Sequence, residues 1–202
     1  MDALQWCAQQ YAHLCDYAYD CVIARRGRAL SLRFTFSPYE FRHLSGLHHL
    51  KHPRLKANSE RLLRDVLDGK LPLAELQKAI NWEEQQTALL SRLDALAQLE
   101  TLLDEFDQIF DFVPKKLLSA SPPIRTKIDA DYLIKFQLPN GTTFFFSVQY
   151  QDAYRGCSLF INDTDDYSAR QTKYTLLEKK KIEQKTGTET LLYRSSSYHP
   201  EA

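Results

Sequence analysis

The spacing of apolar residues changes in the second half of the chain, and this change limits the folds that the chain can adopt. Over residues 83–110 apolar side chains recur every three or four positions, which predicts one long amphipathic helix. After Pro114 and the break at 119–123, apolar and polar residues alternate instead, which is typical of strands. The strands predicted there are 131–138, 142–150 and 157–161. The two periods in separate segments predict an α+β fold.

The first part of the chain predicts a helix, a hairpin and several shorter helices. The hairpin turn is Arg26-Gly27-Arg28, because glycine adopts the backbone conformation that a tight turn requires. Ser37 and Glu40 form a capping box for a helix that is expected to end before Pro53. The predicted elements are a helix at 2–15, strands at 17–23 and 29–36, and helices at 37–52, 58–67 and 72–80.

Two more hairpins are predicted by their turn residues. Asn140-Gly141 is the strongest short hairpin signal in the chain, and Gly187 marks a second turn between 174–184 and 189–194. The expected fold is therefore α+β, with an N-terminal helix and β-hairpin, a helical middle with one long amphipathic helix, and a C-terminal antiparallel sheet. The expected organisation is one domain over 1–195 with a helical insert at about 58–112, and a frayed tail at 196–202.

The charges of the chain balance in total but not by segment. With 26 Lys and Arg against 26 Asp and Glu, the chain is not a uniformly basic nucleic-acid coat, an acidic tail or a polybasic membrane module. Residues 25–64 hold ten basic and two acidic residues, whereas residues 65–111 hold three basic and eleven acidic ones. The basic segment is expected to form a solvated face, to pair with the acidic helix, or to line a groove that holds phosphates.

The composition predicts a cytoplasmic protein without a membrane span. No stretch approaches the roughly 18–20 apolar residues that a spanning helix needs, and the first ten residues do not resemble a secretory signal. The four cysteines form no CxxC pair, so reduced thiols are expected. His48 and His52 have a spacing of four, but no third ligand stands at a diagnostic distance, so we expect neither a metal nor a cofactor.

Four of the six histidines fall within residues 41–52. On a helix, His43 and His48 would share the apolar half, where an imidazole either bonds to a carbonyl or carboxylate or faces a cleft. His43 lies at the margin of the apolar stripe beside Arg42 and Gly46, and is the candidate for proton transfer near neutral pH. For His48 a satisfied core histidine is the plainer interpretation. Gly46 falls within the predicted helix, where glycine is unfavourable. We therefore expect another backbone or a ligand to approach closely at this position.

The C-terminal half interleaves cations with tyrosines; the cations are Lys127, Lys135, Arg155, Arg170 and Lys173. Aromatic faces beside cations suit unpaired nucleic-acid bases, and they equally suit ordinary strand packing. The sequence contains no P-loop, no dinucleotide-binding glycine fingerprint, no GxSxG elbow and no HExxH motif. The enzyme classes that depend on these motifs are therefore not indicated.

Two short motifs resemble those of a known family. One is Phe41-x-His43-Leu44-x-Gly46-Leu47 after a basic hairpin, and the other is Cys157-Ser158-Leu159-Phe160 with Asp166-Tyr167 and Gln171-x-Lys173. Over about residues 10–185 the chain resembles the phage-associated nuclease domains of the barnase–EndoU–colicin–RelE-like group, most of all its fourth phage subgroup. Leu159 stands where this resemblance leads us to expect a second aromatic residue.

The resemblance implies a ribonuclease-like α+β domain carried by phages and mobile elements. We therefore predict a metal-independent endoribonuclease in which His43 is the general acid or base for attack of a ribose 2′-hydroxyl. Lys173 or Arg155 would stabilise the phosphate charge, and Ser158 or Tyr167 would donate hydrogen bonds. The predicted catalytic residues are His43, Ser158, Lys173 and Tyr167. The predicted substrate-binding residues are Arg42, Gly46, Lys51, Arg155, Arg170 and Gln171.

RNA is the expected partner, and an immunity or antitoxin protein is a second; no membrane contact is expected. One alternative is a non-catalytic nucleic-acid- or protein-binding module of phage origin, which would bind in a salt-dependent way without cleavage. Another is an interaction protein that docks a basic partner on the acidic face of the 83–110 helix. The same helix could form the seam of a dimer.

Overall fold

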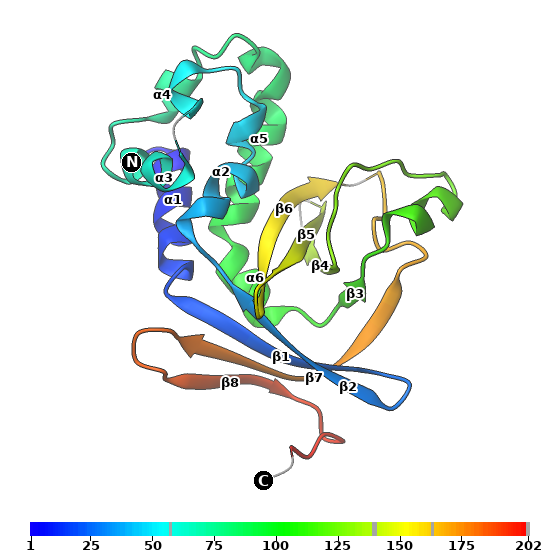
Figure 1. Cartoon of the computed structure of the whole chain (residues 1–202). Helices are drawn as coiled ribbons and strands as arrows, with labels where there is room; N and C mark the ends of the chain where they lie inside the picture. The colour runs from blue at the N-terminus through cyan, green and yellow to red at the C-terminus, as the bar shows by residue number, and fades with distance from the viewer. Residues whose placement is uncertain (57, 139–140, 163, 201–202) are drawn as a thin grey trace.

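Seven strands close into a ring in the computed structural model of the chain, which describes residues 1–56, 58–138, 141–162 and 164–200 (Figure 1). The order around the ring is β1-β2-β6-β5-β4-β3-β7, and β7 pairs back with β1. An eighth strand, β8, adds to β7 outside the ring. The strands are β1 (Tyr17–Arg25), β2 (Arg28–Thr35), β3 (Ile109–Asp111), β4 (Tyr132–Leu138), β5 (Gly141–Tyr150), β6 (Ala153–Asn162), β7 (Thr172–Glu183) and β8 (Glu189–Arg194).

The prediction of a simple C-terminal antiparallel sheet is wrong, because the N-terminal hairpin completes a closed barrel. β1 pairs with β7 from Tyr17 opposite Glu183 to Ala24 opposite Thr175. On the other side of the hairpin, β2 runs parallel to β6 at Phe34 and Thr35. Alternating apolar residues identify a strand but not its partner, and joining distant segments covers edges that an open sheet would leave unpaired.

The predicted hairpins are present. β1 and β2 turn at Gly27, whose φ is +76°, and β7 and β8 turn at Gly187, whose φ is +72°. β4 and β5 pair up to Leu138 opposite Gly141, while residues 139–140 of the predicted Asn140-Gly141 turn lie outside the described residues. Local turn chemistry therefore located the hairpins correctly, although it could not show which strands lie next to one another across the barrel.

Short helices form a lobe over one side of the barrel (Figure 1). In this lobe α5 packs against α1 and also against β6. No helix among the described residues is long and apolar enough to cross a membrane. The helices are α1 (Ala3–Leu14), α2 (Phe41–Leu44), α3 (Ser59–Leu67), α4 (Leu73–Leu76), α5 (Trp82–Ala97) and α6 (Leu99–Glu105). Short 3-10 turns lie at Pro38–Glu40, Leu47–His49, Pro53–Lys56 and Pro114–Ser119.

The single long helix predicted over 83–110 is divided into α5, α6 and strand β3. The apolar residues that recur every three or four positions are buried within the chain, so this stripe already has a partner surface, whereas Leu90 outside the stripe is exposed. A dimer through this segment stays a prediction. These buried residues are Leu89, Leu93, Leu96, Leu99, Leu103, Phe106 and Phe110.

A buried lysine marks the end of α6. The Nζ of Lys179, in β7, donates hydrogen bonds to the carbonyls of Leu103 at 3.0 Å and Phe106 at 2.9 Å. Lys179 is 1% exposed, although it stands in a run of three lysines. The last carbonyls of a helix have no partner within the helix, and a cation both satisfies them and suits the helix dipole. Lys179 thus satisfies carbonyls at the end of α6, just before the chain continues into β3.

The predicted helix over 37–52 is also divided. The capping box of Ser37 and Glu40 forms as predicted, and leads through a 3-10 turn into α2. Gly46 then ends the helix, because its φ of +79° is a left-handed conformation that glycine adopts without steric cost. The residues after it form a separate 3-10 turn, Leu47–His49, so the histidines do not follow one helical stripe.

Two apolar clusters occupy opposite faces of the sheet. The larger cluster takes side chains from all seven strands of the ring as well as from the helices, so it fills the barrel interior. Leu159 belongs to it and is completely buried, which suits an apolar side chain pointing inward. The smaller cluster takes Phe110, Leu133, Phe144 and Phe146 from β3, β4 and β5, and lies outside the barrel under the 112–130 segment.

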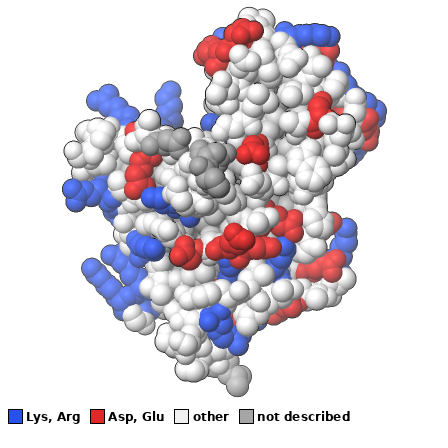
Figure 2. Space-filling model, turned by 180° about the vertical axis from the view of Figure 1, so that it is seen from behind, with Lys and Arg blue, Asp and Glu red and all other residues white. Residues whose placement is uncertain are grey.

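The acidic residues of α6 pair with the C-terminal half of the chain. Lys181 lies 2.7 Å from Glu100 and 2.9 Å from Asp104, whereas Arg33 of the basic segment lies 3.4 Å from Asp20. Seen from behind, Lys and Arg gather along one edge of the molecule, beside a band of Asp and Glu (Figure 2). Basic and acidic side chains therefore lie side by side on this face but form separate groups.

Candidate functional site

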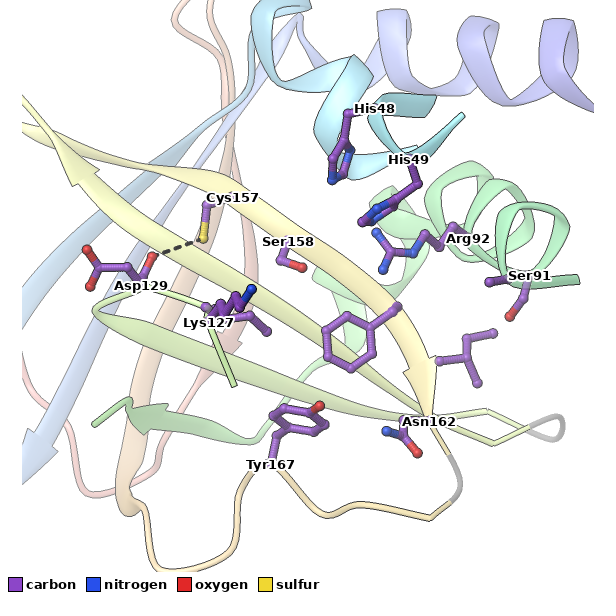
Figure 3. Close-up of a pocket in the computed structure, with 14 residues that line it drawn as sticks. His48, His49, Ser91, Arg92, Lys127, Asp129, Cys157, Ser158, Asn162 and Tyr167 are labelled. Carbon is purple, nitrogen blue, oxygen red and sulfur yellow. Dashed lines mark hydrogen bonds between the residues drawn. The ribbon is translucent and has the colours of Figure 1, made fainter. Parts of the chain in front are cut away.

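A cavity of about 580 Å³ lies between the helical lobe and the outer face of β6 (Figure 3). Its helical wall comes from the Leu47–His49 turn and from α5, and its floor comes from β6. Its far wall comes from residues 127–129 and from Tyr167. A cavity of this size is within the range of about 300–1,000 Å³ that small-molecule ligands occupy. Its lining residues are His48, His49, Ala88, Ser91, Arg92, Lys127, Ile128, Asp129, Cys157, Ser158, Phe160, Ile161, Asn162 and Tyr167.

Two imidazoles form the upper part of the helical wall. The ring centroids of His48 and His49 are 3.9 Å apart, and both rings are directed toward the cavity (Figure 3). Asn81 holds this turn in place, because its amide accepts from the Lys51 backbone N–H at 2.7 Å and donates to the His49 carbonyl at 2.9 Å. The change of direction at Gly46 therefore brings adjacent histidines to the same wall.

The environment of His48 fixes its tautomer. Its Nδ1 lies 3.3 Å from the carbonyl oxygen of Arg42, and a carbonyl only accepts, so Nδ1 carries the hydrogen in this contact. In the neutral ring Nε2 then has a free lone pair. Burial, helped by His49, lowers the pKa of His48 to about 4, and burial together with Arg92 lowers the pKa of His49. His48 is therefore a neutral base at physiological pH.

Arg92 of α5 brings a positive charge to the same wall. Its guanidinium lies 5.7 Å from the ring centroid of Phe160, and it makes no hydrogen bond or ion pair with any residue that the structure describes. Burial lowers its pKa from the ordinary value, but an arginine remains charged in proteins. A half-buried cation without an anionic neighbour is costly, and a bound anion would compensate for it.

The floor and the far wall add hydroxyl groups and a second cation. Ser158 of β6 lies in the middle of the cavity, with Lys127 and Tyr167 across from the histidines (Figure 3). Cys157 is a neighbour, but burial raises the pKa of its thiol to about 11, and its Sγ contacts the Asp129 carbonyl at 3.7 Å. The thiol is thus protonated at neutral pH and is a poor nucleophile.

Of the residues predicted to be catalytic, Ser158 and Tyr167 line the cavity. His43 does not line the cavity, but its exposed side chain adjoins His48, with the two rings tilted by 39° and their centroids 4.6 Å apart. Lys173 is elsewhere: it is exposed on β7, which is separated from β6 by β1 and β2 on one side and by three strands on the other. The four residues are therefore not brought together in one place.

The predicted substrate-binding residues are distributed over the molecule. Arg155 lies outside the cavity, with its guanidinium 3.9 Å from the Tyr150 ring centroid and 3.6 Å from Glu40. Gln171 forms two hydrogen bonds with the backbone of Val113, at 2.9 and 3.2 Å. Arg42 contributes its carbonyl to His48, Gly46 supports Arg92, and Lys51 and Arg170 are exposed.

Sequence reasoning missed Arg92 and His49 as cavity residues, and it named Lys127 only as one of several cations near tyrosines. One signal could have identified Arg92: it is one of three basic residues in the strongly acidic segment 65–111, and it stands on the helix that otherwise carries acids. No sequence signal places Lys127 in the cavity, because it lies in an irregular segment whose position depends on the smaller apolar cluster outside the barrel.

Gly46→Ala is expected to displace Arg92 and to lower the free energy of unfolding by about 1–2 kcal/mol. A Cβ at this position would lie 2.7 Å from the Arg92 Cδ, in a backbone with φ of +79°. Gly27→Ala is the matched control, since its φ is +76° and a Cβ there meets nothing within 4 Å. Denaturant unfolding should show a loss in both variants, whereas the Nε–Hε NMR signal of Arg92 should shift only in Gly46→Ala. An unchanged signal would show that Gly46 does not support Arg92.

The comparisons with known proteins agree with the resemblance seen in the motifs. The family model described as phage-Barnase-EndoU-ColicinE5/D-RelE like nuclease4 matches residues 3–196, nearly the whole chain. The search of curated proteins found no match, and neither did the search of solved structures. Among the described residues, no group of three or more His, Cys, Asp or Glu side chains is arranged to hold a metal ion.

Proposed function

Because the chain belongs to the phage-Barnase-EndoU-ColicinE5/D-RelE like nuclease family, we propose that it is an endoribonuclease that cleaves RNA by attack of a ribose 2′-hydroxyl, without a metal ion. The observation that carries the proposal is the unpaired Arg92 guanidinium beside two largely neutral imidazoles in a cavity of nucleotide size. A cation without a carboxylate neighbour is suited to a phosphate, and a neutral imidazole is suited to accept a proton.

The phosphate would bind between Arg92 and Lys127. Arginine offers several N–H groups in one plane, which match the non-bridging oxygens of a phosphodiester, and Lys127 adds a charge from the far wall (Figure 3). Two protein cations near one phosphate can stabilise the negative charge that develops on its oxygens during the reaction. This is the reason to expect cleavage without a metal ion.

His48 is the proposed general base. Its Nε2 takes the proton from the 2′-hydroxyl as that oxygen attacks phosphorus, a bond forms between O2′ and phosphorus, and a 2′,3′-cyclic phosphate results. His49, beside it, donates a hydrogen bond to the phosphate. Ser158 and Tyr167 supply further hydroxyl donors from the floor and the far wall, in the role that the sequence predicts for them.

Lys127 is the proposed proton donor for the leaving group. In phosphoryl transfer the attacking and the leaving oxygens lie roughly in line, on opposite sides of phosphorus. With the base on the helical wall, the leaving 5′-oxygen faces the wall that carries Lys127 (Figure 3). The bond between phosphorus and the 5′-oxygen breaks, and the ammonium proton passes to that oxygen, leaving a 5′-hydroxyl.

The cavity geometry favours His48 over His43 as the base, since His48 lines the cavity whereas His43 only contacts the His48 ring. The assignment of proton transfer to His43 stays a prediction that variants can separate. An origin in phages or mobile elements is a further proposal, which the family description supports. A cytoplasmic site of action, predicted from the cysteines and the first residues, and an immunity or antitoxin protein as partner stay proposals as well.

The direct test is incubation of the purified protein with a structured RNA in excess EDTA, from about pH 5 to pH 8. We expect discrete fragments that increase with time. RNA that stays intact at every pH, while it binds the protein in a salt-dependent way, would instead support the alternative of a non-catalytic binding module.

A further inference from the structure

The end of the cavity away from the histidines is formed by Asn162, the last residue of β6 (Figure 3). Its side-chain oxygen accepts three hydrogen bonds, from the backbone N–H of Thr164 at 2.8 Å, from the Thr164 hydroxyl at 2.9 Å and from the backbone N–H of Asp165 at 3.1 Å. Asparagine often uses its side-chain oxygen in this way, to accept from backbone N–H groups that follow it.

These hydrogen bonds fix which way the Asn162 amide faces. A backbone N–H can only donate, so the atom that meets the two backbone N–H groups must be the amide oxygen and not the amide nitrogen. The Nδ2 group is left on the side of Tyr167, and it makes no hydrogen bond with any described residue (Figure 3). Asn162 therefore presents a donor of fixed orientation to the cavity.

The surroundings of this donor suit a nucleobase. Phe160 and Tyr167 lie next to it, with ring centroids 5.1 Å apart, and they give the wall an aromatic surface. The Arg92 guanidinium lies 5.7 Å from the Phe160 ring, so the proposed phosphate position adjoins the aromatic wall. Phe160 and Asn162 stand two residues apart on β6 and therefore share one face of the strand, so a nucleotide with its phosphate at Arg92 can place its base against Phe160 and within the part of the cavity that Asn162 lines.

We infer that Asn162 selects the base of the nucleotide whose 2′-hydroxyl attacks, favouring uracil and guanine over cytosine and adenine; this inference rests on the proposed function. Uracil and guanine carry a keto oxygen at the position where cytosine and adenine carry an amino group. A keto oxygen accepts from Nδ2. An amino group would face Nδ2 donor to donor, and both groups would lose hydrogen bonds to water without replacement.

Asn162→Asp is the variant that tests the orientation. A carboxylate keeps one oxygen for the N–H groups of Thr164 and Asp165 and puts a second oxygen where Nδ2 stood, so a donor becomes an acceptor while these contacts are retained. Asn58→Asp is the matched control. Asn58 also accepts from a backbone N–H, that of Arg61 at 2.8 Å, and it does not line the cavity.

The experiment uses DNA oligonucleotides with a single ribonucleotide, U, G, C or A, and measures kcat/KM for each in EDTA. For the wild type and for Asn58→Asp we expect U and G to exceed C and A by about tenfold or more. For Asn162→Asp we expect this ratio to reverse, whatever the overall rate. A parallel arm measures the Kd of uridine 3′-monophosphate and cytidine 3′-monophosphate by NMR titration, with the uridine nucleotide expected to bind about tenfold tighter.

The two arms separate the failure of this inference from the failure of the proposed function. Equal cleavage at all four ribonucleotides would overturn the base preference and leave the nuclease activity in place. If nothing is cut but the uridine nucleotide binds tighter and Asn162→Asp reverses that order, the proposed function fails and the base preference stands. Equal binding of both nucleotides without cleavage would overturn both.

Discussion

His48→Ala is expected to slow RNA cleavage by about 10²–10⁴-fold, the range that a positioned general base contributes. The variant removes the Nε2 lone pair that the Arg42 carbonyl keeps free, while the cations that bind the phosphate remain. The loss should therefore appear in kcat much more than in the affinity for RNA. Single-turnover cleavage and RNA binding, measured on the same preparation, distinguish the two quantities.

Two further variants make this result specific. His48→Gln can still donate to the Arg42 carbonyl but cannot accept a proton as readily, so it should be as slow as His48→Ala and fold as well as the wild type. His43→Ala removes a ring that contacts His48 but does not line the cavity, and its cleavage rate should fall much less. If His43→Ala is the slower variant, His43 is the base and the assignment to His48 is wrong.

The pH dependence of kcat/KM reports on the same group. Because burial lowers the pKa of His48 to about 4, the free enzyme carries the neutral base throughout the range from about pH 5 to pH 8. We expect no loss of kcat/KM on the acid side until the pH approaches about 4, where protonation removes the base. A loss centred near the ordinary histidine pKa of about 6.5 would contradict His48 as the base.

Phe145→Ala is expected to lower the free energy of unfolding by about 3–5 kcal/mol. The Phe145 ring is fully buried in the barrel interior, 6.2 Å from the Phe36 ring and pressed against Gly156 of β6, where a Cβ would lie 2.7 Å from it. Because strands from the whole ring share this interior, the lost contacts weaken the barrel as a unit. Denaturant unfolding followed by circular dichroism gives the value.

Phe145→Leu is the control, since it keeps most of the apolar volume and should cost only about 1–2 kcal/mol. The ordering of the two variants matters more than either value. A loss below about 1 kcal/mol in Phe145→Ala would be the behaviour of a surface residue and would contradict a shared barrel interior.

Local features of the fold were predictable from the sequence, whereas its closure was not. The capping box of Ser37, the turn at Gly27 and the apolar period of α5 each depend on residues close together in the chain, and each forms as predicted. The pairing of β1 with β7 places Tyr17 opposite Glu183. Many strands of the chain could pair with β1, and no local sequence pattern shows which of them does. Lys179 shows the same limit, because its carbonyl partners lie at the end of α6.

The candidate site was predictable in part, for the same physical reason. The motifs pointed to Ser158 and Tyr167, which do line one cavity, and to the segment that carries His48. Treating residues 37–52 as one helix placed His43 in the cleft, but the left-handed Gly46 changes the direction of the chain and presents His48 and His49 instead. Arg92 and Lys127 reach the cavity through tertiary packing.

Product analysis tests the proposed chemistry most directly. A DNA oligonucleotide with one central ribonucleotide, incubated with the protein in EDTA, should be cut only after that ribonucleotide, leaving a 2′,3′-cyclic phosphate and a 5′-hydroxyl that mass spectrometry identifies. Methylation of the same 2′-oxygen should abolish cleavage, because the nucleophile is lost. Cleavage of the methylated oligonucleotide, or products that carry a 5′-phosphate, would contradict attack by the 2′-hydroxyl.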